Sequence, residues 1–320
     1  MVLSDARKAL IEILADGQFY SGSVLAERLG VSRAAIHNHM AALAELGLEV
    51  HRVKGRGYRL SRPLSLLEYE GLSANRDLPV HLFWQLGSTN DFLLKRRHLC
   101  VNGESCLAEM QTQGRGRRGR EWVSPLGCHL YLSYFWRFER GMLAVAGLSL
   151  AVGVLLAESL ETLGVKDVRL KWPNDLYRSG RKLGGILIEM HGQMGEPCEL
   201  VIGAGINISM PEGAAVRIDQ PWIDLADDLP DLDRTALACR VLAHLDQGLG
   251  EFEQSGLKTF VERWRQRDQY ADKPVQLLMG ERKVVGVARG IDEGGNVLIA
   301  LPDGQLKAFG GGEISLRADS

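Results

Sequence analysis

Cysteine is scarce in this chain of 320 residues and 35.3 kDa. The cysteines are odd in number and form no Cys-x-x-Cys pair: Cys100, Cys106, Cys128, Cys198 and Cys239. This usage argues against a disulfide scaffold and against a zinc ribbon. We therefore expect a protein of the reducing cytoplasm, without a metal site of its own.

Targeting and membrane-spanning segments are also lacking. Residues 1–7 show no basic start followed by an apolar run, so no signal peptide is expected. The uncharged segment 141–157 approaches the length that spans a bilayer, but glycines interrupt it and it stands alone. We expect this segment to be a helix, over residues 143–163, buried in a large core. No internal repeat or low-complexity stretch is visible.

The chain is hydrophobic at 45% of its residues and charged at 24%, which is typical of a globular protein. Its length predicts two or three domains. The charge is uneven, because residues 1–62 hold nine Lys or Arg against six Asp or Glu, whereas the whole chain has a net charge of −2. A basic N-terminal region on a mildly acidic protein indicates a polyanionic partner there.

That basic region has the pattern of a helix-turn-helix followed by a wing. Three helices are predicted, the second ended by Gly30 and the third capped by Ser32 and running to Leu46. Residues 48–60 alternate apolar and basic side chains around two glycines, as in a β-hairpin. The apolar positions that mark the helices are Leu3, Leu10, Ile13 and Leu14, then Val24, Leu25 and Leu29, then Ile36, Met40 and Leu43.

Small and polar side chains on the other face of the third helix suit entry into a DNA major groove. Basic residues of the hairpin can meet phosphates, which position a protein without specifying sequence. The DNA-binding candidates are Ser32, Arg33, Ala34, His37, Asn38, Lys54 and Arg56. The alternative is a small helical packing module with a solvated basic face, and helix, turn and wing in this order favour DNA.

Residues 65–270 predict a mixed α/β region. The expected strands are 80–84, 105–111, 130–135, 168–172, 183–190 and 199–206, and the expected helices are 90–97, 143–163, 235–253 and 256–266. Residues 274–317 contain short apolar stretches split by glycines, which indicates a small β-barrel.

A loop rich in glycine and arginine is the strongest single chemical signal, with four arginines in the six residues 115–120. Gly114, Gly116 and Gly119 match the spacing of a dinucleotide fingerprint. We reject that assignment, because the loop is followed by Glu-Trp-Val-Ser-Pro and not by a helix. Arginines on a flexible loop can hold phosphates, and glycines let the loop order around a ligand. A nucleic-acid-binding patch is the alternative that this loop alone leaves open.

Further motifs decide the matter. They are Ser88-Thr-Asn90, Gln111, Lys171-Trp-Pro-Asn-Asp175, Lys182-Leu-Gly-Gly-Ile186, Gly203-Ala-Gly-Ile-Asn207 and Gly311-Gly-Glu-Ile-Ser-Leu-Arg317. With these motifs in order, essentially the whole chain resembles the biotin–protein ligases that also repress the biotin operon. The resemblance implies a multidomain α/β (α+β) fold with three parts. These are a winged helix-turn-helix at 1–63, a mixed-sheet catalytic domain related to class II aminoacyl-tRNA synthetases at 64–271, and an SH3-like barrel at 272–320.

The resemblance implies that biotin and ATP form biotinoyl-5'-AMP, from which biotin passes to a lysine of the biotin carboxyl carrier protein of acetyl-CoA carboxylase. It also implies a set of biotin-binding residues: Ser88, Thr89, Asn90, Gln111, Gly114, Arg115, Gly116, Arg117, Lys182, Gly185, Gly203 and Gly205. Hydroxyl and amide groups suit a ureido ring, and the glycines, Gly184 among them, leave room for the bicycle and its chain.

The same resemblance implies a second set of residues, which bind the phosphates and adenine of the nucleotide: Arg118, Arg120, Trp122, Lys171, Asn174, Asn207 and Trp222. Activation joins a carboxylate to ATP, so the site must offset the repulsion of two anions. Lys182 and Arg117 are the candidates for that task. Asp175 is expected either to orient or deprotonate the acceptor lysine, or only to cap a turn. Magnesium is expected to arrive with ATP, because the acids at 224–233 predict a solvated loop and not a metal cage.

Three partners follow from the resemblance: the carrier protein, operator DNA, and a second copy of the chain in a homodimer promoted by biotinoyl-5'-AMP. Two rival functions stay open. One is a ligand-sensing repressor with an inactive catalytic domain. The other is a lipoate-type ligase, against which the arginine loop and the Lys171–Asp175 motif argue.

Overall fold

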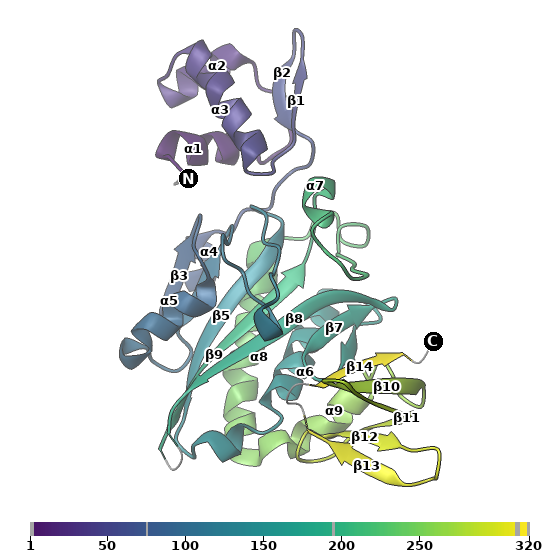
Figure 1. The fold of residues 1–320 in the computed structure, drawn as a ribbon. Helices are drawn as coiled ribbons and strands as arrows, with labels where there is room; N and C mark the ends of the chain where they lie inside the picture. Colours follow the sequence, from purple (N-terminus) through teal and green to yellow (C-terminus); the bar gives the residue numbers. More distant parts are fainter. Residues whose placement is uncertain (1–2, 75, 194–195, 311–313, 319–320) are drawn as a thin grey trace.

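The computed structural model describes residues 3–74, 76–193, 196–310 and 314–318. Within these ranges the chain forms an N-terminal helical unit, a central seven-stranded sheet with helices, and a C-terminal five-stranded sheet (Figure 1). The multidomain α/β class with a mixed central sheet is thereby confirmed. The predicted motif residues Gly311, Gly312 and Glu313 lie outside the described residues.

The N-terminal unit consists of three helices and a hairpin: α1 (Asp5–Leu14), α2 (Gly22–Leu29), α3 (Arg33–Glu45), β1 (Val50–Val53) and β2 (Gly57–Leu60). Local signals set the ends of the helices as predicted. The Ser32 hydroxyl accepts a hydrogen bond from the amide of Ala35, and Gly30 closes α2 in the left-handed region at φ 63°. Ile13, predicted on the apolar face of the first helix, is partly buried and packs against the core, and the fully buried Ile11 belongs to the same core.

The central sheet has the strand order β3-β4-β5-β9-β8-β7-β6. The β3–β4 pair is parallel and the other neighbouring pairs are antiparallel, so the sheet is mixed. The strands are β3 (Val80–Phe83), β4 (Ser105–Ala108), β5 (His129–Phe138), β6 (Arg169–Lys171), β7 (Asp175–Arg178), β8 (Arg181–His191) and β9 (Cys198–Asn207). Strand β4 ends three residues before the predicted end, and β7 was not predicted.

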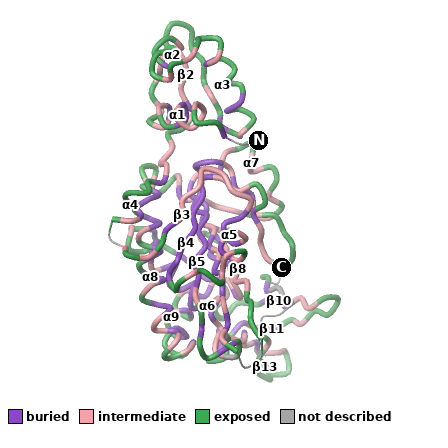
Figure 2. The backbone as a smooth tube through the Cα atoms, turned by 90° about the vertical axis from the view of Figure 1, so that its left-hand side faces the viewer, coloured by how far each residue is buried: buried purple, intermediate pink, exposed green. Residues whose placement is uncertain are grey.

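Helices cover both faces of this sheet. Helix α5 (Thr89–Arg96) packs on the face formed by Cys106, Phe135 and Val201. Helices α6 (Leu148–Thr162) and α8 (Arg234–Ser255) pack against each other and on the opposite face, where the largest core lies (Figures 1 and 2). The short helices are α4 (Tyr69–Ser73), α7 (Glu212–Ala215) and α9 (Val261–Arg265). The predicted helix 256–266 is therefore a 3-10 turn over Gly256–Phe260 followed by α9.

Helix α6 is the uncharged segment of the sequence, and it is buried as predicted. It begins at Leu148 and not at residue 143, because Gly147 has φ 78° and breaks the helical path after a 3-10 turn over Met142–Val145. Among the described residues, no helix combines the length and apolar character needed to cross a membrane.

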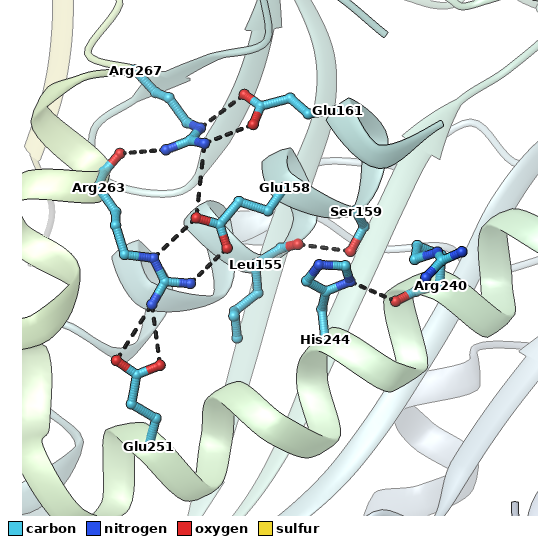
Figure 3. Close-up of polar contacts among 9 residues, drawn as sticks. All are labelled: Leu155, Glu158, Ser159, Glu161, Arg240, His244, Glu251, Arg263 and Arg267. Carbon is cyan, nitrogen blue, oxygen red and sulfur yellow. Dashed lines mark hydrogen bonds and ion pairs between the residues drawn. The ribbon is translucent and has the colours of Figure 1, made fainter. Parts of the chain in front are cut away.

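The helices behind the sheet are joined by a network of ion pairs (Figure 3). Arg263 contacts Glu158 of α6 and Glu251 of α8, and Arg267 contacts Glu161 of α6 at 2.6 Å. Paired, forked contacts of this kind hold three elements in one arrangement better than isolated surface pairs do.

The C-terminal sheet has the order β13-β12-β11-β10-β14 and is antiparallel throughout. Its strands are β10 (Pro274–Met279), β11 (Arg282–Ile291), β12 (Val297–Ala300), β13 (Leu306–Phe309) and β14 (Ile314–Ala318). Its core residues Val275, Leu277 and Ile299 belong to the same apolar cluster as α6. The indole of Trp172 donates to the carbonyl of Gly295, which also ties this sheet to the central region.

The segment after the wing is anchored by a buried ion pair. Arg234 is 1% exposed, pairs with Glu109, and donates to the carbonyl oxygens of Ser65 and His129. Glu109 also accepts from the amide of Leu67 at 2.6 Å. An unpaired charge here would be costly, so this pair fixes the path of the connection between the winged helix and the central sheet.

Candidate active site

A cavity of about 590 Å³ opens on the α5 side of the central sheet. Residues from β5, β8 and β9 form its floor, the glycine and arginine loop forms one wall, and the segment 217–222 forms another. The predicted biotin and nucleotide residues that line it are Ser88, Thr89, Asn90, Gln111, Arg115, Gly116, Arg117, Arg118, Arg120, Trp122, Lys171, Asn174, Asp175, Lys182, Gly185, Gly203, Gly205, Asn207 and Trp222. The predicted motifs, which lie far apart in the sequence, therefore meet in one place.

The lining does not include Gly184, which was predicted to leave room for the bicycle and instead faces the backbone of Gly205, nor does it include Gly114. A Cβ atom there would lie 2.5 Å from the carbonyl oxygen of Trp122 and 2.6 Å from the hydroxyl of Ser124. Because those distances are below any van der Waals contact, glycine is required where the two ends of the loop meet.

Polar side chains at the start of α5 form one connected group. The amide and hydroxyl of Thr89 both donate to the side-chain oxygen of Gln111, at 2.9 and 3.1 Å. The Gln111 amide nitrogen donates to Ser124, whose hydroxyl donates to the carbonyl of Trp122. The fully buried Ser133 hydroxyl contacts both Thr89 and Asn90. Buried polar groups that are satisfied in this way are rigid, which suits the recognition of a small polar ring.

The arginine loop folds back on itself by a bridge between Arg115 and Glu121. Arg115 contacts Asp91 at 2.6 Å, and Arg117 donates to the side-chain oxygen of Asn174 at 2.9 Å. Burial lowers the pKa of Arg117, and the neighbouring charge of Arg118 adds to the effect. Arg118 and Arg120 are exposed at the cavity mouth.

Two lysines face the cavity beside a carboxylate. Lys182 lies 2.8 Å from Asp175. Lys171 donates to the phenol of Tyr177 at 2.9 Å, and burial lowers its pKa. The site therefore concentrates positive charge that a polyphosphate or a carboxylate can use.

Trp122 closes the loop over the sheet. Its ring lies against Gly205, where a Cβ would come within 2.5 Å of the indole, and Lys182 Nζ stands 5.6 Å from the ring centre. The buried indole nitrogen has no hydrogen-bond partner among the described residues. A buried donor without a partner is costly, so this nitrogen indicates an acceptor brought by a ligand.

The segment 221–223 is hydrogen-bonded to β8 beside Lys182. Ile223 donates to the carbonyl of Lys182 at 2.9 Å, and the buried Asn207 amide nitrogen donates to the carbonyl of Ile223 at 3.1 Å. The side-chain nitrogen of Asn207 is therefore hydrogen-bonded to the backbone. Its side-chain oxygen remains available for the predicted contact with adenine. Trp222 lies in this segment, at the cavity wall.

Three of the acids at 224–233 have structural partners, and Asp224 accepts from the amide of Met210 at 2.7 Å. Asp233 caps α8 through the amides of Thr235 and Ala236, and Asp228 pairs with Arg178. Within the part of the chain that the structure describes, no three His, Cys, Asp or Glu side chains converge as metal ligands would.

Several residues in the site carried no signal in the sequence. Asp91 and Glu189 hold Arg115, Ser124 and Ser133 complete the polar group around Gln111, and Tyr177 contacts Lys171. Leu316 and Arg317 of β14 also reach the cavity, although they belong to the predicted C-terminal motif and were given no role in the site. Their roles depend on contacts between distant segments, and only the alternation of β8 could have indicated that Glu189 faces the cavity side.

The predicted DNA-binding residues gather on the N-terminal unit, away from the cavity. Arg33, Ala34, His37 and Asn38 are exposed along α3, and Ser32 is exposed at its start. Lys54 is exposed at the hairpin, where Arg56 stacks over the ring of Phe19 at 4.2 Å. The geometry is that of a protruding helix with a basic wing beside it.

Comparisons with known proteins agree along the whole chain. Residues 83–207 match the biotin/lipoate A/B protein ligase family, residues 6–59 an HTH domain, and residues 271–317 the biotin protein ligase C-terminal domain. The bifunctional ligase/repressor BirA of Salmonella typhimurium is 46% identical over 97% of this chain and 97% of its own. That of Escherichia coli is 45% identical over 97% and 96%. The solved biotin protein ligase of Aquifex aeolicus, in complex with biotin and ATP, is 30% identical with a TM-score of 0.65, covering 75% of this chain and 99% of that one.

Proposed function

Because the chain belongs to the biotin–protein ligase family, in its bifunctional ligase/repressor branch, we propose that the cavity on the central sheet is where biotin is activated. The protein is a ligase that converts biotin and ATP to biotinoyl-5'-AMP and pyrophosphate, and then transfers the biotinoyl group to a lysine of a biotin carboxyl carrier protein with release of AMP. It is also a repressor that binds DNA through its N-terminal helix-turn-helix.

One observation supports the assignment of the cavity. The same cavity is lined by hydrogen-bonded polar side chains, which suit the uncharged ring of biotin, and by a cluster of cations, which suits the phosphates of ATP. Thr89 and Gln111 belong to the first set, and Lys171, Lys182 and the loop arginines belong to the second. A carboxylate does not acylate an amine at neutral pH, since its leaving group would be oxide. Conversion to an acyl-adenylate makes AMP the leaving group, and this step requires both sets of residues together.

Biotin takes the end formed by Ser88, Thr89, Asn90 and Gln111 in this proposal, with Gly203 and Gly205 beneath it. The orphaned indole nitrogen of Trp122 supports a ligand acceptor nearby. The remaining biotin contacts fall to the loop at residues 115–117 and to Gly185.

The nucleotide takes the cationic end. Lys182 contacts both the biotin carboxylate and the α-phosphate, and so offsets the charge that builds between them. Arg117, Arg118 and Arg120 serve the phosphates, while Asn174, Asn207 and Trp222 border the adenine. Magnesium enters with ATP as its counter-ion, because no carboxylate cage stands ready among the described residues.

Asp175 has two candidate tasks. Its ion pair with Lys182 supports a part in placing that ammonium group. When the acceptor lysine of the carrier attacks the adenylate, the same carboxylate orients the amine or takes its proton.

Regulation follows from the arrangement of the parts. We propose domain boundaries at residues 63/64, after β2 ends at Leu60, and at 271/272, before β10 begins at Pro274. Biotinoyl-5'-AMP orders the arginine loop and thereby completes a surface for a second copy. The dimer then binds a palindromic operator more tightly than the monomer does. We place both the ligase and the repressor activity in the cytoplasm.

The test is incubation with biotin, ATP, magnesium and a carrier domain, read by mass spectrometry of the carrier. We expect one biotinoyl group on one lysine, and none when ATP is omitted. Lipoate in place of biotin should leave the carrier unmodified. An unmodified carrier under the complete conditions would contradict the proposed function.

A further inference from the structure

Glu189 on β8 touches two residues of the cavity wall at once. One oxygen accepts from the side-chain amide of Asn90 at 2.8 Å, and both oxygens lie 3.0–3.2 Å from Arg115 Nη2. Glu189 itself lies outside the cavity lining, whereas both of its partners belong to it. The same carboxylate therefore connects the start of α5 to the arginine loop.

The contact with Asn90 fixes which way that carboxamide points. Its nitrogen donates to Glu189 and to the carbonyl of Leu187, so its oxygen is turned toward the Ser133 hydroxyl. Gly203 lies directly beneath, where a Cβ would come within 2.5 Å of the Asn90 oxygen. Asn90 is 4% exposed, and both polar atoms of its carboxamide have hydrogen-bond partners.

The contact with Arg115 closes a ring of polar contacts around the pocket. From Arg115 the ring passes through Glu189, Asn90, Ser133, Thr89, Gln111 and Ser124 to the carbonyl of Trp122, at the other end of the loop. Asp91 provides a second anchor for Arg115. A polar network is rigid only when every member is satisfied, and Glu189 is the member that joins pocket and loop.

We propose that Glu189 is a positioning residue for biotin: it orients the Asn90 carboxamide and draws Arg115, and with it the loop, onto the pocket. This inference rests on the proposed function of the cavity. Only an ionised carboxylate can accept charge-assisted bonds from both donors, because a glutamine in its place would turn a donor toward Asn90 or Arg115.

The test compares Glu189→Gln with wild type in biotin-dependent ATP–pyrophosphate exchange, with direct measurement of the biotin dissociation constant. We expect that constant to rise about tenfold, the loss expected for one charge-assisted hydrogen bond, while the KM for ATP at saturating biotin stays unchanged. Trypsin should also cut the biotin-bound loop faster in the variant, since its arginines are held less firmly.

Glu199→Gln is the matched control. Glu199 lies on the neighbouring strand β9 and also faces two arginines, Arg97 and Arg137, but it is remote from the lining. Its variant should behave as wild type does. Asp91→Asn removes one anchor of Arg115 and leaves Asn90 untouched, so it should speed loop cleavage and weaken biotin less than Glu189→Gln does.

The inference would be overturned if Glu189→Gln left the biotin dissociation constant unchanged. It would also be overturned if the biotin dissociation constant and the KM for ATP rose by the same factor. If that variant does not fold, an unchanged biotin dissociation constant in Glu189→Asp, whose shorter side chain draws the carboxylate away from Asn90 and Arg115, would overturn it instead. Absence of exchange in the wild-type protein would count against the proposed function and not against the role of Glu189.

Discussion

The N-terminal unit and the cavity hold their positive charges in different ways. In the N-terminal unit, arginines lie over aromatic rings: Arg56 and Arg59 over Phe19, Arg52 over Tyr58, and Arg28 over Tyr20. In the cavity, cations face acceptors: Lys182 faces Asp175, Arg115 faces Asp91 and Glu189, and Arg117 faces Asn174.

This difference matches what each surface must do. An aromatic ring holds a guanidinium in place without neutralising it, so the charge stays available to a phosphate backbone. A carboxylate partner lowers the cost of burying a cation and sets its position to within a fraction of an ångström. A charged surface and a precise pocket are therefore built from the same residue types by changing their neighbours.

The largest expected effect lies in the cavity. Lys182→Ala should lower adenylate synthesis by about a thousandfold or more, because it removes the cation beside both reacting anions. Biotin-dependent ATP–pyrophosphate exchange measures this, and the thermal unfolding of the variant checks that the fold is intact. Normal adenylate yield would remove Lys182 from its role.

Asp175→Asn should separate the two half-reactions. If the carboxylate serves the acceptor lysine, transfer to the carrier slows by about a hundredfold, and much more than adenylate formation does. Single-turnover measurements of each step provide the comparison. Equal slowing of both steps would assign Asp175 to the placement of Lys182 alone.

Arg56→Ala should affect only DNA binding by the N-terminal unit. We expect about a tenfold loss of operator affinity and a smaller dependence of that affinity on salt, with ligase activity unchanged. Titration of operator DNA at several salt concentrations tests this, and Arg240→Ala, an exposed position on α8, is the control. A ligase defect in Arg56→Ala would break the separation of the two regions.

Phe19→Leu should have the smallest effect. It removes the ring under Arg56 and Arg59 but leaves both charges, so operator affinity should fall only about two- to fivefold. The salt dependence should stay that of wild type, because no phosphate contact is removed. A loss as large as that of Arg56→Ala would show that Phe19 does more than hold the arginines.

The sequence predicted best where the determinants are local. Ser32 and Gly30 mark the ends of the helices in the N-terminal unit by capping chemistry alone, and both predictions are confirmed. Strand β7 was missed because Asp175–Arg178 is short and polar and forms a strand only between β6 and β8. The early start predicted for α6 overlooked Gly147, whose positive φ stops the helix.

Within the site, motifs predicted which segments meet but not how they are held. Glu189 contacts Asn90 and Arg115, which lie 99 and 74 residues away in the sequence. No periodicity or spacing encodes such a pairing, since it depends on the register of β8 against β9. The roles of the individual biotin and nucleotide residues remain predictions for the experiments above.

The central claim is that the arginine loop closes over biotin and ATP on the central sheet. A crystal structure of the protein with both compounds tests it most directly. The account predicts biotin between Gln111 and Lys182, the nucleotide beside Lys171 and Trp222, and loop residues 115–122 in contact with both. Ligands bound elsewhere, or a loop that stays clear of them, would contradict it.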